Sequence, residues 1–345
     1  MESHDEEACV VSTIAGSRDP AFADGLGPMA SFRGPLGIVC DSEGALLVVD
    51  ADNRRVRKIK AGHVTTLAGT GALGCTDGAT ATFNDPTGVC IDASGTIYVC
   101  DAGSHTIRRI ASNGSVVTIA GSGRPGHADG VGASAAFSYP FGIAAAPDGT
   151  LLVADSSNHC IRRVTADGMV TTLAGRCVQG ATDGNGARAA FNYPVGVAVD
   201  AAGVAYVADR SNHRVRTVDK FGAVRTLAGT GISGYNDGPG LKSTFEWPHA
   251  VTVDSGGNVY VSDTFTFQVR RIGKDGIVKR VCRGAERARD RDRQQSGDRQ
   301  TATGLKCICM DSKRDDVMYV TDQANNCIQR INFLQSSEPP QPPPS

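Results

Sequence analysis

One phrase that recurs six times along the chain constrains its fold more than any other feature. It reads VVDADNRRVRKI at 48–59 and returns as VCDAGSHTIRRI, VADSSNHCIRRV, VADRSNHRVRTV, VSDTFTFQVRRI and VTDQANNCIQRI. The aspartates of these copies are spaced by 51, 54, 54, 54 and 59 residues. Six copies at such a period indicate either a propeller or a solenoid.

The third unit shows what one repeat contains. It has four apolar runs, GIAAA (142–146), TLLVAD (150–155), CIRRV (160–164) and MVTTLAG (169–175), joined by PDG, SSNH and TADG. Short connectors of this kind close antiparallel hairpins, and four antiparallel strands make a propeller blade. No 3.6-residue period is present, which excludes a helical solenoid. The sequence therefore predicts an all-β, six-bladed β-propeller of four-stranded blades.

The two ends of the chain complement each other. The sixth unit has only three strand-like runs, at 305–311, 316–322 and 326–333, and lacks the VTTLAG run. The missing run stands near the N-terminus as VVSTIAG, 10–16. We predict that this N-terminal strand joins blade six as its outermost strand and closes the ring, because closure removes an open sheet edge.

The repeats divide the chain into a propeller at 10–333, an N-terminal tail at 1–9 and a proline-rich tail at 334–345. The segment 283–303 replaces the usual connection between units five and six with RGAERARDRDRQQSGDRQ, whose charges alternate. We expect this segment to be a mobile loop. The expected blades span about 34–69, 87–121, 141–175, 195–229, 249–282 and 304–333 plus 10–16.

Composition narrows the environment and the partners. The formal net charge is −1, and no apolar stretch approaches the roughly 18 residues of a membrane helix, so neither nucleic acid nor a membrane is favoured. The N-terminus is acidic and lacks the pattern of a signal peptide. Eleven cysteines without CxxC spacing are typical of buried reduced thiols. We therefore expect a cytoplasmic monomer.

The aspartate of each recurring phrase, here called the blade-end aspartate, is expected to serve the fold. An arginine follows it seven residues later in five units, and Gln329 takes that place in the sixth. A hairpin would bring the two side chains together in a charge-assisted hydrogen bond. The predicted structural residues are Asp50, Asp101, Asp155, Asp209, Asp263 and Asp322 with Arg57, Arg108, Arg162, Arg216 and Arg270.

The crossovers between blades repeat a second pattern. Eight residues after the Ala-Gly that ends each fourth strand comes an Asp-Gly pair, followed by Phe and Pro. We interpret Asp-Gly as a turn, Phe as a plug between blades and Pro as the entry into the next strand. A calcium-binding ring of aspartates is the weaker alternative, because the pattern supplies no further oxygen ligands.

Variable residues just after the blade-end aspartates are the binding candidates. The turn between the second and third strands and the long crossover lie at the same end of a blade, so loop length gathers on one face of the disc, here called the loop face. We expect a protein or peptide partner to bind there. The candidate contacts are Asn53, Arg54, His105, Asn158, His159, Asn212, His213, Arg214 and Asn326.

Three of these candidates, His105, His159 and His213, take equivalent places in successive units, a pattern that a shared metal site would also produce. The second strand lies about 4.8 Å outside the innermost one, so equivalent residues of adjacent blades should be on the order of 10 Å apart. Zinc–nitrogen bonds are about 2.0 Å long. We therefore predict no metal and no cofactor.

Only the start of the innermost strand comes near the propeller axis. There the motif is Pro-x-Gly, with Leu36, Thr87, Phe141 and Val195 at x, then His249 in Trp-Pro-His-Ala and Lys306 as the sixth equivalent. The ring is mostly apolar, and His249 and Lys306 are its channel candidates. No catalytic residues are predicted.

The string P-x-G-[IV]…V-x-D-x-x-N-H-x-[IV]-R-[RK]-[IV] resembles the NHL repeat and covers about 10–333. The resemblance implies a six-bladed propeller that acts as an interaction platform. Amidating lyases among such proteins bind zinc through a histidine at x of Pro-x-Gly in three blades, and here only His249 matches. Lactonase-like propellers need acidic or polar channel ligands, which this ring lacks.

The sequence thus favours a non-enzymatic NHL-type propeller that binds or scaffolds a protein or peptide. The alternative is a lyase or hydrolase that uses the channel around His249. RNA binding is weaker still, because the basic residues Arg54, Arg55 and Arg214 are opposed by the repeated aspartates.

Overall fold

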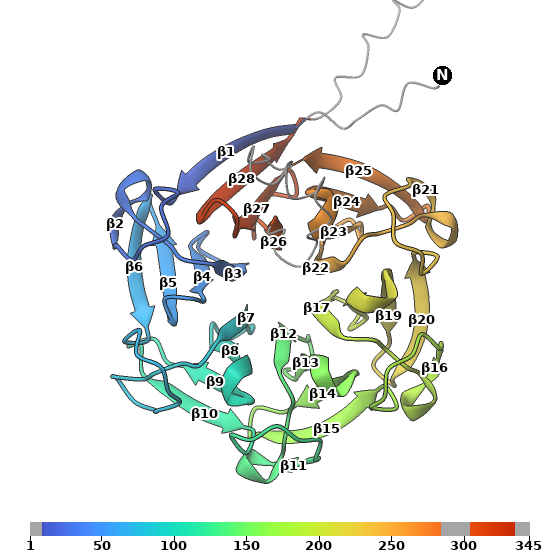
Figure 1. Cartoon of the computed structure of the whole chain (residues 1–345), viewed down its shortest axis with the longest axis horizontal. Coiled ribbons are helices and arrows are strands. Elements are labelled where there is room, and N and C mark those ends of the chain that lie inside the picture. The colour runs from blue at the N-terminus through green and yellow to red at the C-terminus, as the bar shows by residue number, and fades with distance from the viewer. Residues whose placement is uncertain (1–8, 284–303, 335–345) are drawn as a thin grey trace, which may run out of the picture.

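The computed structural model describes residues 9–283 and 304–334, which form six antiparallel sheets arranged as blades around an axis (Figure 1). The predicted six-bladed β-propeller is confirmed. Blades one to three, innermost strand first, comprise β3 (Pro35–Cys40), β4 (Leu46–Asp50), β5 (Arg55–Lys60), β6 (His63–Ala68) and β2 (Gly25–Leu26); β7 (Pro86–Ile91), β8 (Ile97–Asp101), β9 (Thr106–Ile110) and β10 (Val116–Ala120); and β12 (Pro140–Ala145), β13 (Leu151–Asp155), β14 (Cys160–Val164), β15 (Met169–Ala174) and β11 (Gly130–Val131).

Blades four to six follow the same plan. They comprise β17 (Pro194–Val199), β18 (Ala205–Asp209), β19 (Arg214–Val218), β20 (Ala223–Ala228) and β16 (Gly184–Asn185); β22 (Pro248–Val253), β23 (Val259–Asp263), β24 (Gln268–Ile272), β25 (Ile277–Arg283) and β21 (Gly238–Pro239); and β26 (Leu305–Met310), β27 (Val317–Asp322), β28 (Cys327–Phe333) and β1 (Cys9–Ala15). Among the described residues no helix is both long and apolar enough to cross a membrane.

The N-terminal strand closes the ring as predicted. β1 pairs antiparallel with β28, in a register that sets Cys9 opposite Phe333 and Val11 opposite Ile331 (Figure 1). The strand takes the fourth position, which β6, β10, β15, β20 and β25 hold in the other blades. The charged segment expected to be a mobile loop lies, apart from its first residue, at 284–303, outside the described residues, as does the predicted proline-rich tail beyond Leu334.

Four blades carry a fifth, two-residue strand that the sequence did not predict. In blade one, β2 begins at the glycine of an Asp-Gly pair and Gly25 pairs with Val64 of β6. The φ angle of Gly25 is +138°, a conformation that favours glycine. The crossover therefore pairs with the fourth strand of the blade that it is about to enter.

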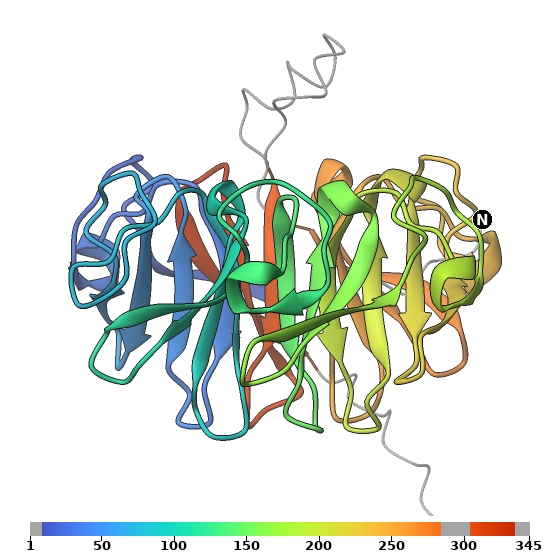
Figure 2. The same cartoon turned by 90° about the horizontal axis from the view of Figure 1, so that it is seen from below.

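The two faces of the disc differ in their connections. Tight hairpin turns fill one face, while the crossovers and the 3-10 helices that follow the blade-end aspartates fill the other; the remaining 3-10 helices lie at the outer rim, as Figure 2 shows. This second face is the loop face. The 3-10 helices are η1 (Gly27–Met29), η2 (Ala102–Ser104), η3 (Gly132–Ser134), η4 (Ser156–Asn158), η5 (Gly186–Arg188), η6 (Arg210–Asn212), η7 (Gly240–Lys242) and η8 (Thr264–Thr266).

The hydrophobic core lies between neighbouring blades. Leu47 and Val49 of blade one, for example, pack with Val89 and Val99 of blade two around Phe83 of the crossover that joins them. One such phenylalanine in each of five crossovers is fully buried. The predicted role of this residue as a plug between blades agrees with that position.

A buried arginine links the second strand, the third strand and the crossover within each of five blades. Its guanidinium lies 2.6 to 3.4 Å from the blade-end aspartate and 2.5 to 2.8 Å from the aspartate of the preceding Asp-Gly pair. The arginine and blade-end aspartate side chains have no exposed surface. The Asp-Gly aspartates are thus arginine acceptors, which removes the basis of the calcium alternative. In blade six, Gln329 donates to Asp322 instead, at 2.7 Å.

Candidate functional site

The innermost strands approach one another closely around the axis because glycine follows x in the Pro-x-Gly motif. A Cβ added to Gly142 would stand 2.1 Å from the carbonyl oxygen of Val195 in the next blade, and one added to Gly37 would stand 2.4 Å from that of Thr87. In blade five, Ala250 replaces this glycine. There the hydroxyl of Ser262 donates to the carbonyl of Lys306 across the blade boundary, at 2.7 Å.

This close approach of the innermost strands leaves little space around the axis halfway between the two faces of the disc. The cavity there measures about 70 Å³ and is lined mainly by glycines and by aliphatic residues such as Ile38, Val89 and Ile143. The cavity at this level is therefore small, with room for a few water molecules. A ligand would have to enter from one face.

At the loop-face end the channel opens into a cavity of about 270 Å³, here called the axial pocket. The Pro-x-Gly residues Leu36, Phe141, Val195, His249 and Lys306 form its floor. Its remaining walls are Ala51, Asp52, Asp85, Tyr139, Tyr193, Arg210 and Gln323. The pocket is thus considerably more polar than the apolar ring that the sequence predicted.

The unexpected polar residues come from two positions in the repeat. Asp85, Tyr139 and Tyr193 directly precede the proline of Pro-x-Gly, and each has a left-handed φ of 54 to 62°. Asp52, Arg210 and Gln323 come one or two residues after a blade-end aspartate. The left-handed backbone before each proline turns the side chain toward the axis. A glycine, Gly34, at the same place in blade one is the sequence signal that marks this conformation.

Arg210 and Lys306 make one side of the axial pocket cationic. Burial and the nearby Arg210 lower the pKa of Lys306 to about 8, and burial also lowers the pKa of Arg210. Within 9–283 and 304–334 neither cation forms an ion pair with an acidic side chain, although Arg210 lies over the Trp247 ring at 4.4 Å. Two cations held close together without a carboxylate favour the binding of an anion.

His249 lies beside this cationic side. It is 5% exposed, and its ring meets Phe141 edge-on with the centroids 5.2 Å apart. Its Nδ1 has no hydrogen-bond partner in the described part of the chain. Burial and the neighbouring Lys306 and Arg210 hold the pKa of His249 well below its usual range, so the imidazole is neutral.

Asp52 and Asp85 supply negative charge on the side formed by blades one and two. The hydroxyl of Tyr139 donates to the carboxylate of Asp85, and burial raises the pKa of Asp52. The axial pocket therefore has an acidic side and a basic side. A ligand with one anionic end would be oriented by this difference.

Most of the loop-face candidates are engaged in the fold itself. Nδ1 of His105 and of His159 each accepts a backbone N–H of the next blade at 3.0 Å, and His213 does so at 3.3 Å. The amides of Asn53, Asn158 and Asn212 bond to their blade-end aspartates and to crossover carbonyls.

Of the other three candidates, two also form hydrogen bonds within the fold. Arg214 donates to two crossover carbonyls, and Asn326 accepts the N–H of Gly34. Arg54 has no such bond among the described residues. Most of the nine loop-face candidates are thus hydrogen-bonded within the fold, whereas His249 and Lys306 line the axial pocket.

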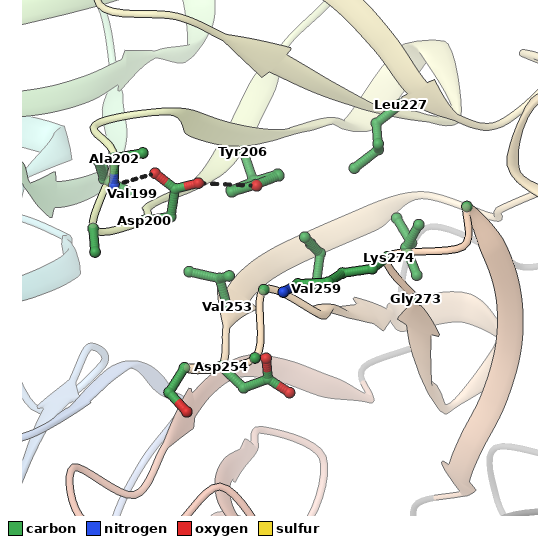
Figure 3. Close-up of a pocket in the computed structure, with 16 residues that line it drawn as sticks. Val199, Asp200, Ala202, Tyr206, Leu227, Val253, Asp254, Val259, Gly273 and Lys274 are labelled. Carbon is green, nitrogen blue, oxygen red and sulfur yellow. Dashed lines mark hydrogen bonds between the residues drawn. The ribbon is translucent and has the colours of Figure 1, made fainter.

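A larger cavity, about 640 Å³, opens between blades four and five on the opposite face (Figure 3). Its acidic groups already serve the hairpin turns: Asp200 accepts the N–H of Ala202 and the hydroxyl of Tyr206, and Asp254 accepts the N–H of Asn258. The Lys274 side chain passes over Gly257 in the same groove. Since its carboxylates have these partners, we place the candidate site at the axial pocket instead.

The sequence of the chain is similar to those of several known proteins. Residues 18–233 match the family model described as SMP-30/gluconolactonase/LRE-like region. The chain is 30% identical over 298 residues to NHL repeat-containing protein 2 of Bos taurus, which covers 74% of the chain and 41% of that protein. It is 29% identical over 281 residues to Protein SUPPRESSOR OF QUENCHING 1, chloroplastic, of Arabidopsis thaliana, covering 75% of the chain and 27% of that protein. The chain thus spans less than half the length of these curated relatives.

Solved structures show the same architecture at low sequence identity. The gluconolactonase XC5397 of Xanthomonas campestris superposes with a TM-score of 0.62 at 16% identity, covering 94% of this chain and 90% of that one. Virginiamycin B lyase of Staphylococcus aureus superposes with a TM-score of 0.57 at 13% identity, covering 95% and 100%. These likenesses concern the fold alone. The match over 18–233 and the NHL-type repeats together show that the chain belongs to the SMP-30/gluconolactonase/LRE-like family of β-propellers.

Proposed function

We propose that the chain is a non-enzymatic binding module that takes an acidic side chain or the C-terminal carboxylate of a protein or peptide partner into the axial pocket. The observation that carries this proposal is the convergence of Arg210 and Lys306 on the pocket without an acidic partner in the described residues. The partner's carboxylate would give these two cations the ion-pair partner that they lack, on the side of the pocket opposite Asp52 and Asp85.

The chemistry of the two cations suits a carboxylate. A guanidinium offers a planar pair of N–H donors that matches the two oxygens of a carboxylate, and Lys306 adds a point charge. Partial burial strengthens both contacts, because the effective dielectric constant falls away from bulk water. The uncompensated cations are costly in the unbound protein, and a bound anion would relieve that cost.

The size of the axial pocket favours a single side chain or chain terminus of a macromolecule over a drug-sized ligand. Its volume of about 270 Å³ falls below the roughly 300–1,000 Å³ that pockets for drug-sized ligands occupy. A single side chain or chain terminus fits this space. The rest of the partner would lie across the loop face, where the crossovers supply contact area.

Fluorescence anisotropy with a labelled tetraglutamate peptide, and with tetraglutamine as its neutral match, tests this proposal. We expect the glutamate peptide to bind more tightly. Arg210→Met and Lys306→Met should each weaken binding roughly tenfold or more, since a hydrogen bond to a charged group contributes about 1.5–3 kcal/mol. Arg188→Met, which removes an exposed arginine at the end of η5, outside the axial pocket, is the matched control.

The pH dependence has a defined sign. Because the pKa of Lys306 is about 8, its charge is lost as the pH rises through that value, and affinity for the glutamate peptide should fall. Lys306→Arg should keep the affinity and flatten this profile. Equal binding of both peptides, or equal losses in Arg188→Met and Arg210→Met, would contradict the proposal. Tighter binding of oligouridylate than of tetraglutamate would move the assignment to RNA.

A second candidate function rests on Lys306 and His249 together. A lysine whose pKa is about 8, next to a neutral imidazole, is a competent general base. A lyase or hydrolase acting in the axial pocket would use this pair, and hydrolysis of a panel of small lactones would reveal it. His249→Ala should abolish such turnover while leaving peptide binding intact. Within the described residues, no group of three potential metal ligands lies in the pocket, so such chemistry would rest on these side chains.

A further inference from the structure

Three side chains with metal-ligating atoms meet at the outer part of blade three, far from the axial pocket along the blade. His127 lies in the crossover that enters the blade, Cys160 begins β14, and Cys177 lies in the crossover that leaves it. Their ligand atoms all lie within 4.8 Å of one another, and Sγ of Cys177 is 3.0 Å from Nε2 of His127. Among the described residues this is the one group of three potential ligands at such spacing.

The backbone at Cys177 points independently to a purpose for that side chain. Its φ is +59°, in the left-handed region that disfavours residues with a Cβ. The equivalent residue is a glycine in blades one, two and four, namely Gly71, Gly123 and Gly231 with φ of 77 to 92°, and it is Arg18, with φ of 72°, after the closing strand of blade six. A cysteine therefore occupies a position for which the fold prefers glycine.

The partner position has changed in the same blade. In blades one and four the third strand begins with Arg55 or Arg214, whose guanidinium lies over the left-handed glycine; a Cβ on Gly71 would stand 2.2 Å from Nη1 of Arg55. In blade three this arginine is replaced by Cys160. The exchange of Arg and Gly for two cysteines leaves two thiols where other blades hold a guanidinium.

The third ligand also stands at a defined repeat position. His127 follows its Ala-Gly pair by six residues, where blade two has Cys75 and blade one has Phe22, which stacks on Arg55 at 3.8 Å. This position packs over the start of the third strand in each of these blades. Of these three blades, only blade three has a side chain that can bind a metal through nitrogen or sulfur at each of the positions of His127, Cys160 and Cys177.

We propose that Cys160, Cys177 and His127 form a zinc site. Two thiolates and an imidazole are ligands that Zn²⁺ prefers, in a tetrahedral arrangement with Zn–S near 2.3 Å and Zn–N near 2.0 Å. On binding, each thiol releases its proton to solvent, the imidazole binds through Nε2, and a water molecule takes the fourth position. His127 is exposed, so the ion can enter from solvent. The ion would join both crossovers of blade three to its third strand.

Cobalt titration of the reduced protein under nitrogen tests the site. Co²⁺ should bind with one equivalent and give the thiolate charge-transfer band and the visible bands of a four-coordinate ion, and Zn²⁺ should abolish them. Cys177→Gly restores the residue of blades one, two and four, so this variant should fold with an unchanged or higher melting temperature. It should nevertheless lose the cobalt spectrum completely, and His127→Ala should weaken it at least tenfold.

Two control variants test whether the cobalt spectrum comes from this group of three residues. Cys75→Ser changes the cysteine that stands in blade two where His127 stands in blade three, and Cys282→Ser removes a thiol near Cys9; both should keep the cobalt spectrum. The assignment is overturned if the wild type gives no cobalt spectrum, if Cys177→Gly retains it, or if thiol counting shows that Cys160 and Cys177 form a disulfide in the reduced preparation.

Discussion

Replacing Asp155 with alanine would test whether the buried arginine network stabilises the propeller. The carboxylate of Asp155 is fully buried and accepts three hydrogen bonds: from the N–H of Ser138 at 2.7 Å, and from Asn158 and Arg162 at 2.8 Å each. The substitution therefore removes the acceptor of three donors, one of which is the buried cation Arg162.

The expected loss can be worked from these contacts. Removing one partner of a buried ion pair costs about 3–5 kcal/mol. Arg162 keeps the half-exposed Asp129, at 2.8 Å, and two carbonyl oxygens, which places the loss near the lower end of that range. The unfolding entropy of about 2 cal/mol/K per residue gives about 0.6 kcal/mol/K for a propeller of about 300 residues. We therefore expect the melting temperature to fall by about 5–7 °C.

Differential scanning calorimetry at pH 7 measures this change. Asp167→Ala removes the same charge from an exposed turn of the same blade and should shift the melting temperature by no more than about 1–2 °C. Arg162→Gln, which copies the Gln329–Asp322 pair of blade six, should cost less than Asp155→Ala, because an uncharged donor remains. If Asp155→Ala melted within about 1 °C of the Asp167→Ala control, the network would not have the stabilising role that we infer.

Two further outcomes are expected. Gly142→Ala should lower the melting temperature by several degrees, because its methyl group would stand 2.1 Å from the carbonyl oxygen of Val195 and overpacking costs about 1–3 kcal/mol. The calorimetric control is Gly126→Ala, whose methyl group would make a milder contact, 3.1 Å from the Cβ of Ala136. An equal effect of both substitutions would refute the close-approach argument. Oxidised glutathione should convert Cys9 and Cys282 to a disulfide that joins the closing strand to blade five, because their sulfurs are 2.7 Å apart and the hydrogen bond between them lowers the pKa of Cys9 to about 7. The melting temperature should then rise by a few degrees in the wild type and not in Cys9→Ser. Persistence of both thiols in a thiol count would contradict this expectation.

The sequence determined the features that depend on contacts within one repeat. The blade-end aspartate and the arginine seven residues later lie on the two strands of one hairpin, so their pairing follows from a single turn. Ring closure joins the two ends of the chain, but the sequence predicted it too, because blade six lacks one run of the repeat, the N-terminus supplies that run, and an unpaired sheet edge is costly. The inward positions of His249 and Lys306 followed from the Pro-x-Gly repeat.

Only the tertiary structure decided which residues of different blades meet. Arg210 and Asp85 share the axial pocket although they belong to blades four and two, because the ring brings them to one axis. His127 and Cys177 meet because two successive crossovers fold back along the same blade. The spacing of these residues along the sequence does not show that they lie close together, because both contacts depend on the curvature of the ring and on how adjacent blades pack. The fold is therefore readable from the local repeat, while the composition of each site is set by contacts between segments far apart in the chain.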